Sequence, residues 1–193
     1  MSEARGNRSK ILVITALLTA IVVVLQYLGQ FIRFGTFSIS LVLIPIVIGA
    51  AIGGPKVSTW LGLVFGGIVL ATDAGAFLAI NVVGTVVTVI VKGIACGAVA
   101  GFAYKLIEKK NKYVAVVVAA ILCPLVNTGV FLLGCVAFFL DTIREWGTAF
   151  GFGSTLEYVF LGLVGGNFLF EVATNAILSP IVVKLLSILK VRS

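Results

Sequence analysis

Long runs of apolar residues with very few charges constrain this chain more than any other feature. Only 11% of its 193 residues are charged, whereas about a quarter of the residues in a soluble domain are. The mean hydropathy is correspondingly high, at +1.24. A helix crosses the hydrocarbon core of a bilayer with about 20 apolar residues. These runs therefore predict membrane-spanning helices rather than a water-soluble core.

Glycine, proline and charged residues divide the chain into six predicted spans, which form one transmembrane domain over residues 1–193. Pro55 follows two glycines at the end of one apolar run, and the polar run 108–112 ends another. Residues 141–154 are predicted to form a glycine-rich loop. The expected fold is an all-α membrane protein, a six-transmembrane-helix bundle with helices at about residues 11–29, 39–52, 57–72, 78–107, 113–140 and 155–189.

Basic residues are distributed unevenly between the two sides of the predicted bundle. Six spans put both termini on one side, and most of the 14 lysines and arginines fall on that side too. Basic loops remain in the cytoplasm, so both termini are predicted to be cytoplasmic. Arg33 and Arg144 lie on the opposite side, and Lys92 falls inside a span. The residues on the predicted cytoplasmic side are Arg5, Arg8, Lys10, Lys56, Lys105, Lys109, Lys110, Lys112, Lys184, Lys190 and Arg192.

A few polar residues lie at membrane depth. Lys92 and Glu171 each fall well inside a predicted span, where inserting an ionisable group costs about 2.5 to 3.5 kcal/mol. Each must face protein or water and is a functional candidate. Amides and hydroxyls recur around them at intervals of three or four residues, which places them on common helix faces. The polar residues of the last three spans are Asn81, Thr85, Thr88 and Lys92; Asn127 and Thr128; and Asn167, Glu171 and Asn175.

These polar stripes predict a chamber between the last three spans that suits a small polar molecule. Two simpler interpretations stay open: the threonines only hydrogen-bond between helices, and Lys92 with Glu171 form only a buried ion pair. Arg33 and Trp146 are predicted to gate the chamber, with an interfacial aromatic belt as the alternative. Asp73 is interpreted as a loop residue. The expected lining is Asn81, Thr85, Lys92, Asn127, Asn167, Glu171 and Asn175.

Motifs for catalysis and for metal or nucleotide binding are missing from the chain. It has no histidine. It also has no GxxxxGK[ST] loop to bind the phosphates of ATP, so it cannot hydrolyse ATP by itself. Its three cysteines lie in apolar stretches without metal-ligand spacing, and we interpret them as small buried apolar residues. We therefore expect a protein that is not an enzyme and that uses no cofactor and no metal. Nucleic acid is not an expected partner, because the basic residues sit at helix ends.

Several short motifs occur together in an order that resembles a known family. One is the Ala-xxx-Ala pattern formed by Ala16 and Ala20 in the first predicted span. The others are SLVLIP at 40–45 with IGA at 48–50, GPK at 54–56 with LGLVFG at 61–66, and CPLVNTGVF at 123–131. Together they resemble the substrate-binding (S) components of energy-coupling factor (ECF) vitamin transporters.

The resemblance implies a subunit of the cell membrane that captures one water-soluble vitamin near the outer face and releases it inside. Pantothenate is the best match, and riboflavin, folate and cobalamin are the other options. It also implies partners: a transmembrane coupling subunit, which docks on Ala16 and Ala20, and two cytoplasmic ATPases. The alternative is a stand-alone secondary transporter or channel in which Lys92 and Glu171 form a proton-coupled pair.

Overall fold

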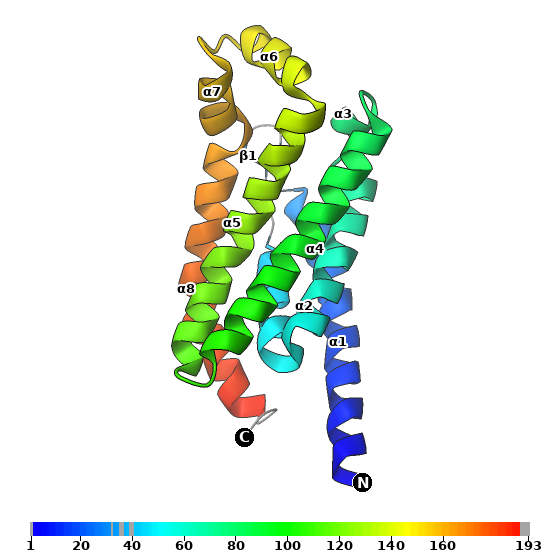
Figure 1. The fold of residues 1–193 in the computed structure, drawn as a ribbon, viewed down its shortest axis with the longest axis vertical. Coiled ribbons are helices and arrows are strands. Elements are labelled where there is room, and N and C mark those ends of the chain that lie inside the picture. Colours follow the sequence, from blue (N-terminus) through cyan, green and yellow to red (C-terminus); the bar gives the residue numbers. More distant parts are fainter. Residues whose placement is uncertain (1, 32, 35–36, 39–40, 190–193) are drawn as a thin grey trace.

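A computed structural model describes residues 2–31, 33–34, 37–38 and 41–189, and nearly all of them are helical (Figure 1). The prediction of a helical fold is thereby confirmed. The long helices are α1 (Ser2–Gly29), α2 (Leu43–Thr72), α4 (Val82–Ile107), α5 (Lys112–Phe138) and α8 (Gly165–Leu189). The short elements are the antiparallel pair β1 (Arg33–Phe34) and β2 (Phe37–Ser38), the helices α3 (Gly75–Leu78), α6 (Leu140–Ala149) and α7 (Thr155–Glu157), and the π-helix η1 (Tyr158–Leu163).

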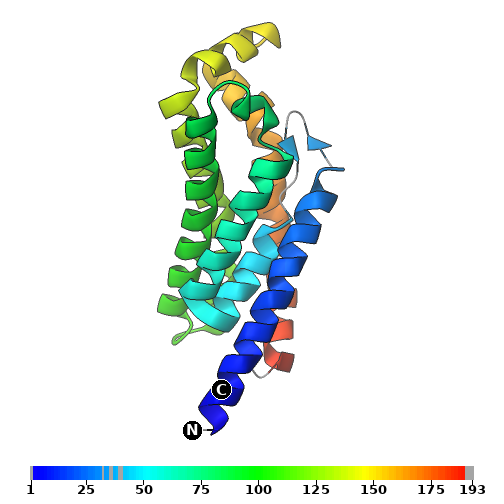
Figure 2. The same cartoon turned by 90° about the vertical axis from the view of Figure 1, so that its right-hand side faces the viewer.

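The long helices form one elongated bundle. α4 packs between α2 and α5, α8 packs on α5, and α1 packs on the outside of α2 (Figures 1 and 2). α1 begins and α8 finishes at the same end of the bundle (Figure 1).

α2 joins two segments that the sequence predicts as separate spans, 39–52 and 57–72. Its helix is broken at Gly54, whose φ of 69° is a conformation that glycine adopts without strain. A Cβ on Gly49 would collide with Leu61, although twelve residues of straight helix would separate them by about 18 Å. The two arms of α2 therefore fold back on each other, as Figure 2 shows.

The number of spans differs from the predicted six. Among the described residues, four helices are long and apolar enough to cross a membrane, with α2 counted once. A fifth span exists if the bent pair Thr155–Leu163 and Phe168–Lys184 crosses as one. The difference arises at α2, because its first arm, residues 43–53, is only about 16 Å long and is shorter than the hydrocarbon core.

Two predicted segments near the C-terminus need correction. The loop predicted at 141–154 contains α6, which buries Ile143 and joins Arg144 Nη1 to Asp141 Oδ1 at 3.2 Å. The single helix predicted at 155–189 is broken, because η1 ends at Leu163 and α8 begins at Gly165, with a bend of 40°. A Cβ on Gly165 would collide with the carbonyl oxygen of Phe160, so the glycine permits this break.

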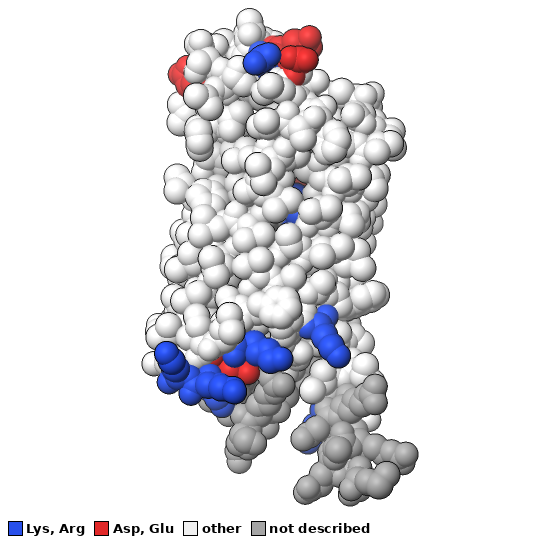
Figure 3. Space-filling model, in the orientation of Figure 1, with Lys and Arg blue, Asp and Glu red and all other residues white. Residues whose placement is uncertain are grey.

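Charge separates the two ends of the bundle. Lysines gather at the turn between α4 and α5 and at the break in α2, and we call this the basic end (Figure 3). Acidic side chains, with one arginine, lie at the opposite end, which α3, α6 and α7 cover and which we call the capped end. The uneven charge distribution predicted from the sequence is thus present in the fold.

Small buried residues lie at the contacts between helices in the basic half of the bundle. α4 contributes Cys96 and Ala100, and α5 contributes Ala119 and Cys123, all with at most 2% relative exposure. The backbones of α2 and α4 touch there, since a Cβ on Gly97 would collide with the carbonyl oxygen of Ser58. Close approach of this kind stabilises helix pairs in lipid through van der Waals contact.

Candidate functional site: a polar pocket in the capped half

A pocket lies in the capped half, between α2, α4, α5 and the broken segment η1–α8. About 750 Å³ of space free of protein atoms lies within it, a volume that includes open solvent at its margin, so the enclosed cavity is smaller. From the capped end it reaches Lys92, ten residues or about 15 Å into α4. Its polar lining consists of Gln26, Asp73, Thr85, Thr88, Lys92, Asn127, Thr128 and Glu171.

Lys92 is the cation of the pocket. Its Nζ lies 5.6 Å from the ring centroid of Phe65 in α2 and 5.3 Å from that of Phe131 in α5. Contacts of this kind stabilise an ammonium group by about 0.5 to 2 kcal/mol, depending on how far it is desolvated. The two rings hold the charge in the interior, where it remains partly accessible from the pocket.

Two carboxylates share the pocket with Lys92. Glu171 reaches it from the second turn of α8 and is 5% exposed. Asp73 reaches it from the end of α2. Both act electrostatically on Lys92, Glu171 more strongly. The predicted meeting of Lys92 and Glu171 therefore occurs in one cavity, but within a group of three charges.

Three buried polar atoms on the pocket wall have no hydrogen-bond partner in the described part of the chain. They are Gln26 Oε1, Thr88 Oγ1 and Asn127 Oδ1, and their residues are at most 5% exposed. Leaving such a group unsatisfied in an apolar interior costs about 1 to 3 kcal/mol. Gln26 comes from α1, Thr88 from α4 and Asn127 from α5, so three helices direct unused hydrogen-bonding capacity into one space.

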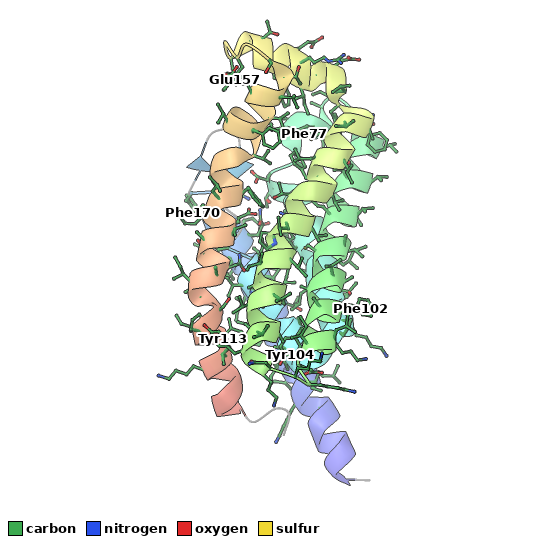
Figure 4. All side chains as sticks on the ribbon, turned by 60° about the vertical axis from the view of Figure 1, so that its left-hand side comes forward. Phe77, Phe102, Tyr104, Tyr113, Glu157 and Phe170 are labelled. Atoms are coloured by element: carbon green, nitrogen blue, oxygen red, sulfur yellow. The ribbon has the colours of Figure 1, made fainter. Side chains whose placement is uncertain are left out.

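Aromatic side chains form the wall nearest the capped end. The ring of Phe77 in α3 packs edge-on against Phe131, Phe139 and Trp146, with centroids 5.8, 4.9 and 5.4 Å away. Figure 4 shows Phe77 directed between the helices, whereas Phe102 and Phe170 lie on the outside. Trp146 in α6 packs against Phe77, but no described residue of α6 lines the pocket itself.

Four of the predicted chamber residues line the pocket: Thr85, Lys92, Asn127 and Glu171. Thr85 Oγ1 is already engaged, donating to the carbonyl oxygen of Asn81 at 2.7 Å. Asp73 lies in the turn after α2, as the sequence indicated, and it also lines the pocket.

Three predicted site residues lie elsewhere. Asn81 caps α4, its Oδ1 accepting from the Gly84 amide at 2.9 Å. Asn175 Nδ2 donates to the carbonyl oxygen of Glu171 at 2.8 Å, one turn below the pocket. Trp146 stands behind Phe77. The side chains of Arg33 and Asn167 lie outside the described part, so their predicted roles stay predictions.

Sequence reasoning missed Gln26 and the aromatic wall. Gln26 follows the buried Leu18 and Val22 at intervals of four residues, a periodicity that identifies a face turned inward. The phenylalanines carried no such signal, because apolar rings are frequent on lipid-facing and buried surfaces alike.

The predicted docking residues Ala16 and Ala20 are exposed on α1. Leu18, between them, is 5% exposed, and two residues of helix turn a side chain by about 200°. The two alanines therefore face away from the bundle.

The fold is a helical bundle, and its interior pocket contains a lysine, two carboxylates and, within the described residues, two amide oxygens without hydrogen-bond partners. This combination is typical of a membrane protein that binds a polar solute. The model of the family described as "ECF transporter, substrate-specific component" matches residues 10–183, and the chain belongs to this family. Its members are substrate-binding subunits of transporters and are not an enzyme family. The predicted resemblance is thus confirmed at the level of the family. No curated protein and no solved structure matches the chain.

Proposed function

We propose that this chain captures a water-soluble vitamin in the pocket and delivers it across the membrane as the S component of an ECF importer. The observation that carries the proposal is the set of three unpartnered atoms, on Gln26, Thr88 and Asn127, around the space that Lys92 faces. A polar ligand would satisfy all three at once, whereas an apolar one would leave them unpaired.

Pantothenate is the first compound to test. Its carboxylate would take its counter-charge from Lys92 or Arg33, while its hydroxyls and amide would bond to the amide side chains of the pocket. Riboflavin, folate and cobalamin are the other candidates, and their flat rings would lie against the aromatic wall that Phe77 and Phe131 form.

The chain would sit in the cell membrane with its basic end in the cytoplasm. Lysines at that end support this orientation, because basic segments remain inside. Counting the two arms of α2 separately, and the bent pair once, gives the six predicted segments with both termini cytoplasmic. The capped end then faces outside, where Arg33 and Trp146 would control access to the pocket.

The proposed partners are a transmembrane coupling subunit and two cytoplasmic ATPases. ECF S components associate with such a module as a family. The exposed Ala16 and Ala20 support docking on α1, since small residues let a second helix approach closely in lipid.

Mass spectrometry of the small molecules released from the purified, denatured protein is the first experiment. Affinity for the released compound, or for pantothenate, is then measured in detergent. Lys92→Met should weaken binding by tenfold or more, whereas Lys105→Met, on an exposed site of the same helix, should leave it unchanged. Equal affinity in both variants would remove Lys92 from the binding site.

Transport distinguishes the proposal from a stand-alone secondary transporter that uses Lys92 and Glu171 as a proton-coupled pair. The chain alone in liposomes should bind its ligand without accumulating it, and uptake should require the coupling subunit, the ATPases and ATP. Accumulation driven by a proton gradient in liposomes that contain only this chain would favour the rival function.

A further inference from the structure

α1 contacts the rest of the bundle along one narrow stripe. Its buried side chains Leu18, Val22 and Gln26 recur every four residues, which places them on a single face. In the most apolar window of Ser9–Gly29, 17% of the residues are buried, against 56% for the corresponding window of α2. α1 is therefore the least embedded of the four long spans.

Gln26 is unusual for the position it occupies. It ends the stripe nearest the capped end, is 1% exposed, and lines the pocket. Its Oε1 accepts no hydrogen bond from any described residue. Within a bilayer no lipid can supply that bond, so the amide oxygen is a site for a donor that enters the pocket.

Polar contacts matter for α1 because lipid chains are as apolar as its side chains, and the hydrophobic effect does not hold the helix in place. Near the middle of the helix, Trp60 Nε1 of α2 donates to Thr19 Oγ1 at 3.2 Å. Gln26 lies on the same face of α1 as Thr19, two turns nearer the capped end, and its Oε1 accepts no hydrogen bond from a described residue.

We propose that a bound ligand donates a hydrogen bond to Gln26 and thereby holds the capped half of α1 against the bundle. Occupancy of the pocket then sets the position of α1. This inference rests on the proposed function, because it takes the pocket as the ligand site. It adds Gln26 as a residue that contacts the ligand and couples ligand binding to the position of α1.

The coupling runs in both directions. If ligand stabilises the docked position of α1, anything that draws α1 away weakens ligand binding by the same factor. Ala16 and Ala20 lie on the face of α1 that points away from Leu18 and the pocket. A partner helix that bound to that face and displaced α1 would therefore weaken ligand binding.

Hydrogen exchange of the detergent-purified protein tests the inference. The probe is whichever of pantothenate, riboflavin, folate and cobalamin raises the midpoint of thermal unfolding most, at a concentration that saturates each variant. In the wild type the probe should slow exchange in peptides covering residues 20–29 at least fivefold. In Gln26→Leu that protection should be lost, although protection around Lys92 in α4 remains.

Asn127→Leu is the matched control, because it removes an amide from the same pocket but from α5, and the oxygen of that amide likewise has no partner among the described residues. It should weaken binding, yet at saturation the probe should still protect residues 20–29. Without ligand, Gln26→Leu should unfold at the wild-type temperature or above, since it removes an unsatisfied group.

Three results decide the matter. Full protection of residues 20–29 in saturated Gln26→Leu would overturn the inference while leaving the pocket as a binding site. A lower unfolding temperature for ligand-free Gln26→Leu would also overturn it, because Gln26 would then have a structural partner. If none of the four compounds raised the wild-type midpoint, the proposed substrate class would fail, and this inference with it.

Discussion

The two halves of the bundle are built from the same helices on opposite principles. In the basic half, α2, α4 and α5 touch through glycine, alanine and cysteine, and backbone lies on backbone. In the capped half the same helices line a pocket, and the chain between α5 and α8 contains α6, α7 and η1. The helices of the basic half are closely packed, whereas the capped half contains polar atoms without partners among the described residues.

This contrast indicates where stability and function reside. Small residues in the basic half give α2 and α4 a rigid contact, on which the looser half can be supported. Unsatisfied groups such as Thr88 Oγ1 lower the stability of the empty protein. The two halves should therefore respond differently to substitution, and the following variants are arranged by the size of the effect.

Gly97→Val should have the largest effect, because the added side chain meets the backbone of Ser58 and Thr59, which cannot move aside. We expect a loss of about 3 kcal/mol, at the upper end of the usual cost of overpacking, and little monodisperse protein on size-exclusion chromatography. Gly67→Val is the control, since nothing lies within 4 Å of a Cβ there. Comparable yields of the two variants would show that the α2–α4 contact is not rigid.

Phe77→Ala should come next, by removing the ring that Phe131, Phe139 and Trp146 contact. A loss of about 3 kcal/mol is typical for a buried phenylalanine, and ligand affinity should fall with it. Thermal unfolding in detergent gives the first quantity and a binding titration the second. Phe102→Ala, at a side chain 59% exposed, should change neither, and similar losses in both variants would contradict the proposed wall.

Thr88→Val should separate stability from binding. It removes a hydroxyl that has no partner in the described structure, so the empty protein should gain about 1 kcal/mol while ligand affinity falls about fivefold. Thr72→Val is the matched change at a hydroxyl that donates to Ile68 O at 2.8 Å, and it should bring no gain. A destabilised Thr88→Val protein with normal affinity would make this residue structural only.

The smallest effect should come from the bond between Trp60 Nε1 and Thr19 Oγ1, 3.2 Å long. Interhelical hydrogen bonds in membrane proteins contribute about 0.6 kcal/mol on average. A double-mutant cycle with Trp60→Phe and Thr19→Val measures the coupling free energy directly. A coupling energy of zero would mean that α1 is held by apolar contact alone in this region.

Much of the architecture could be predicted from the sequence because the bilayer leaves few choices. Apolar length and breakers located the helices, and the basic residues located one end. The arms of α2 were separated correctly in sequence at Gly54, but sequence gives no angle between two helices. The break before Gly165 was missed because its cause, contact with Phe160 O, involves a carbonyl that no residue type reveals.

Site residues could be predicted from the sequence where a charged side chain interrupts an apolar segment. Lys92 and Glu171 stood out because charge at membrane depth is expensive, and both line the pocket. Asn81 and Asn175 share the same helical spacing, but local hydrogen bonds to their own helices use them instead. Spacing predicts a face, and it does not predict competition from the nearby backbone.

The buried residues between Lys92 and the basic end have a consequence for the permeability of this protein to ions. The side chains of Cys96, Ala100, Ala119 and Cys123 are buried between Lys92 and the basic end. The ammonium group of Lys92 lies above them and opposes the entry of cations. We therefore expect the chain on its own to be impermeable to small ions. Proteoliposomes carrying only this chain should accordingly hold a potassium diffusion potential as long as protein-free vesicles do.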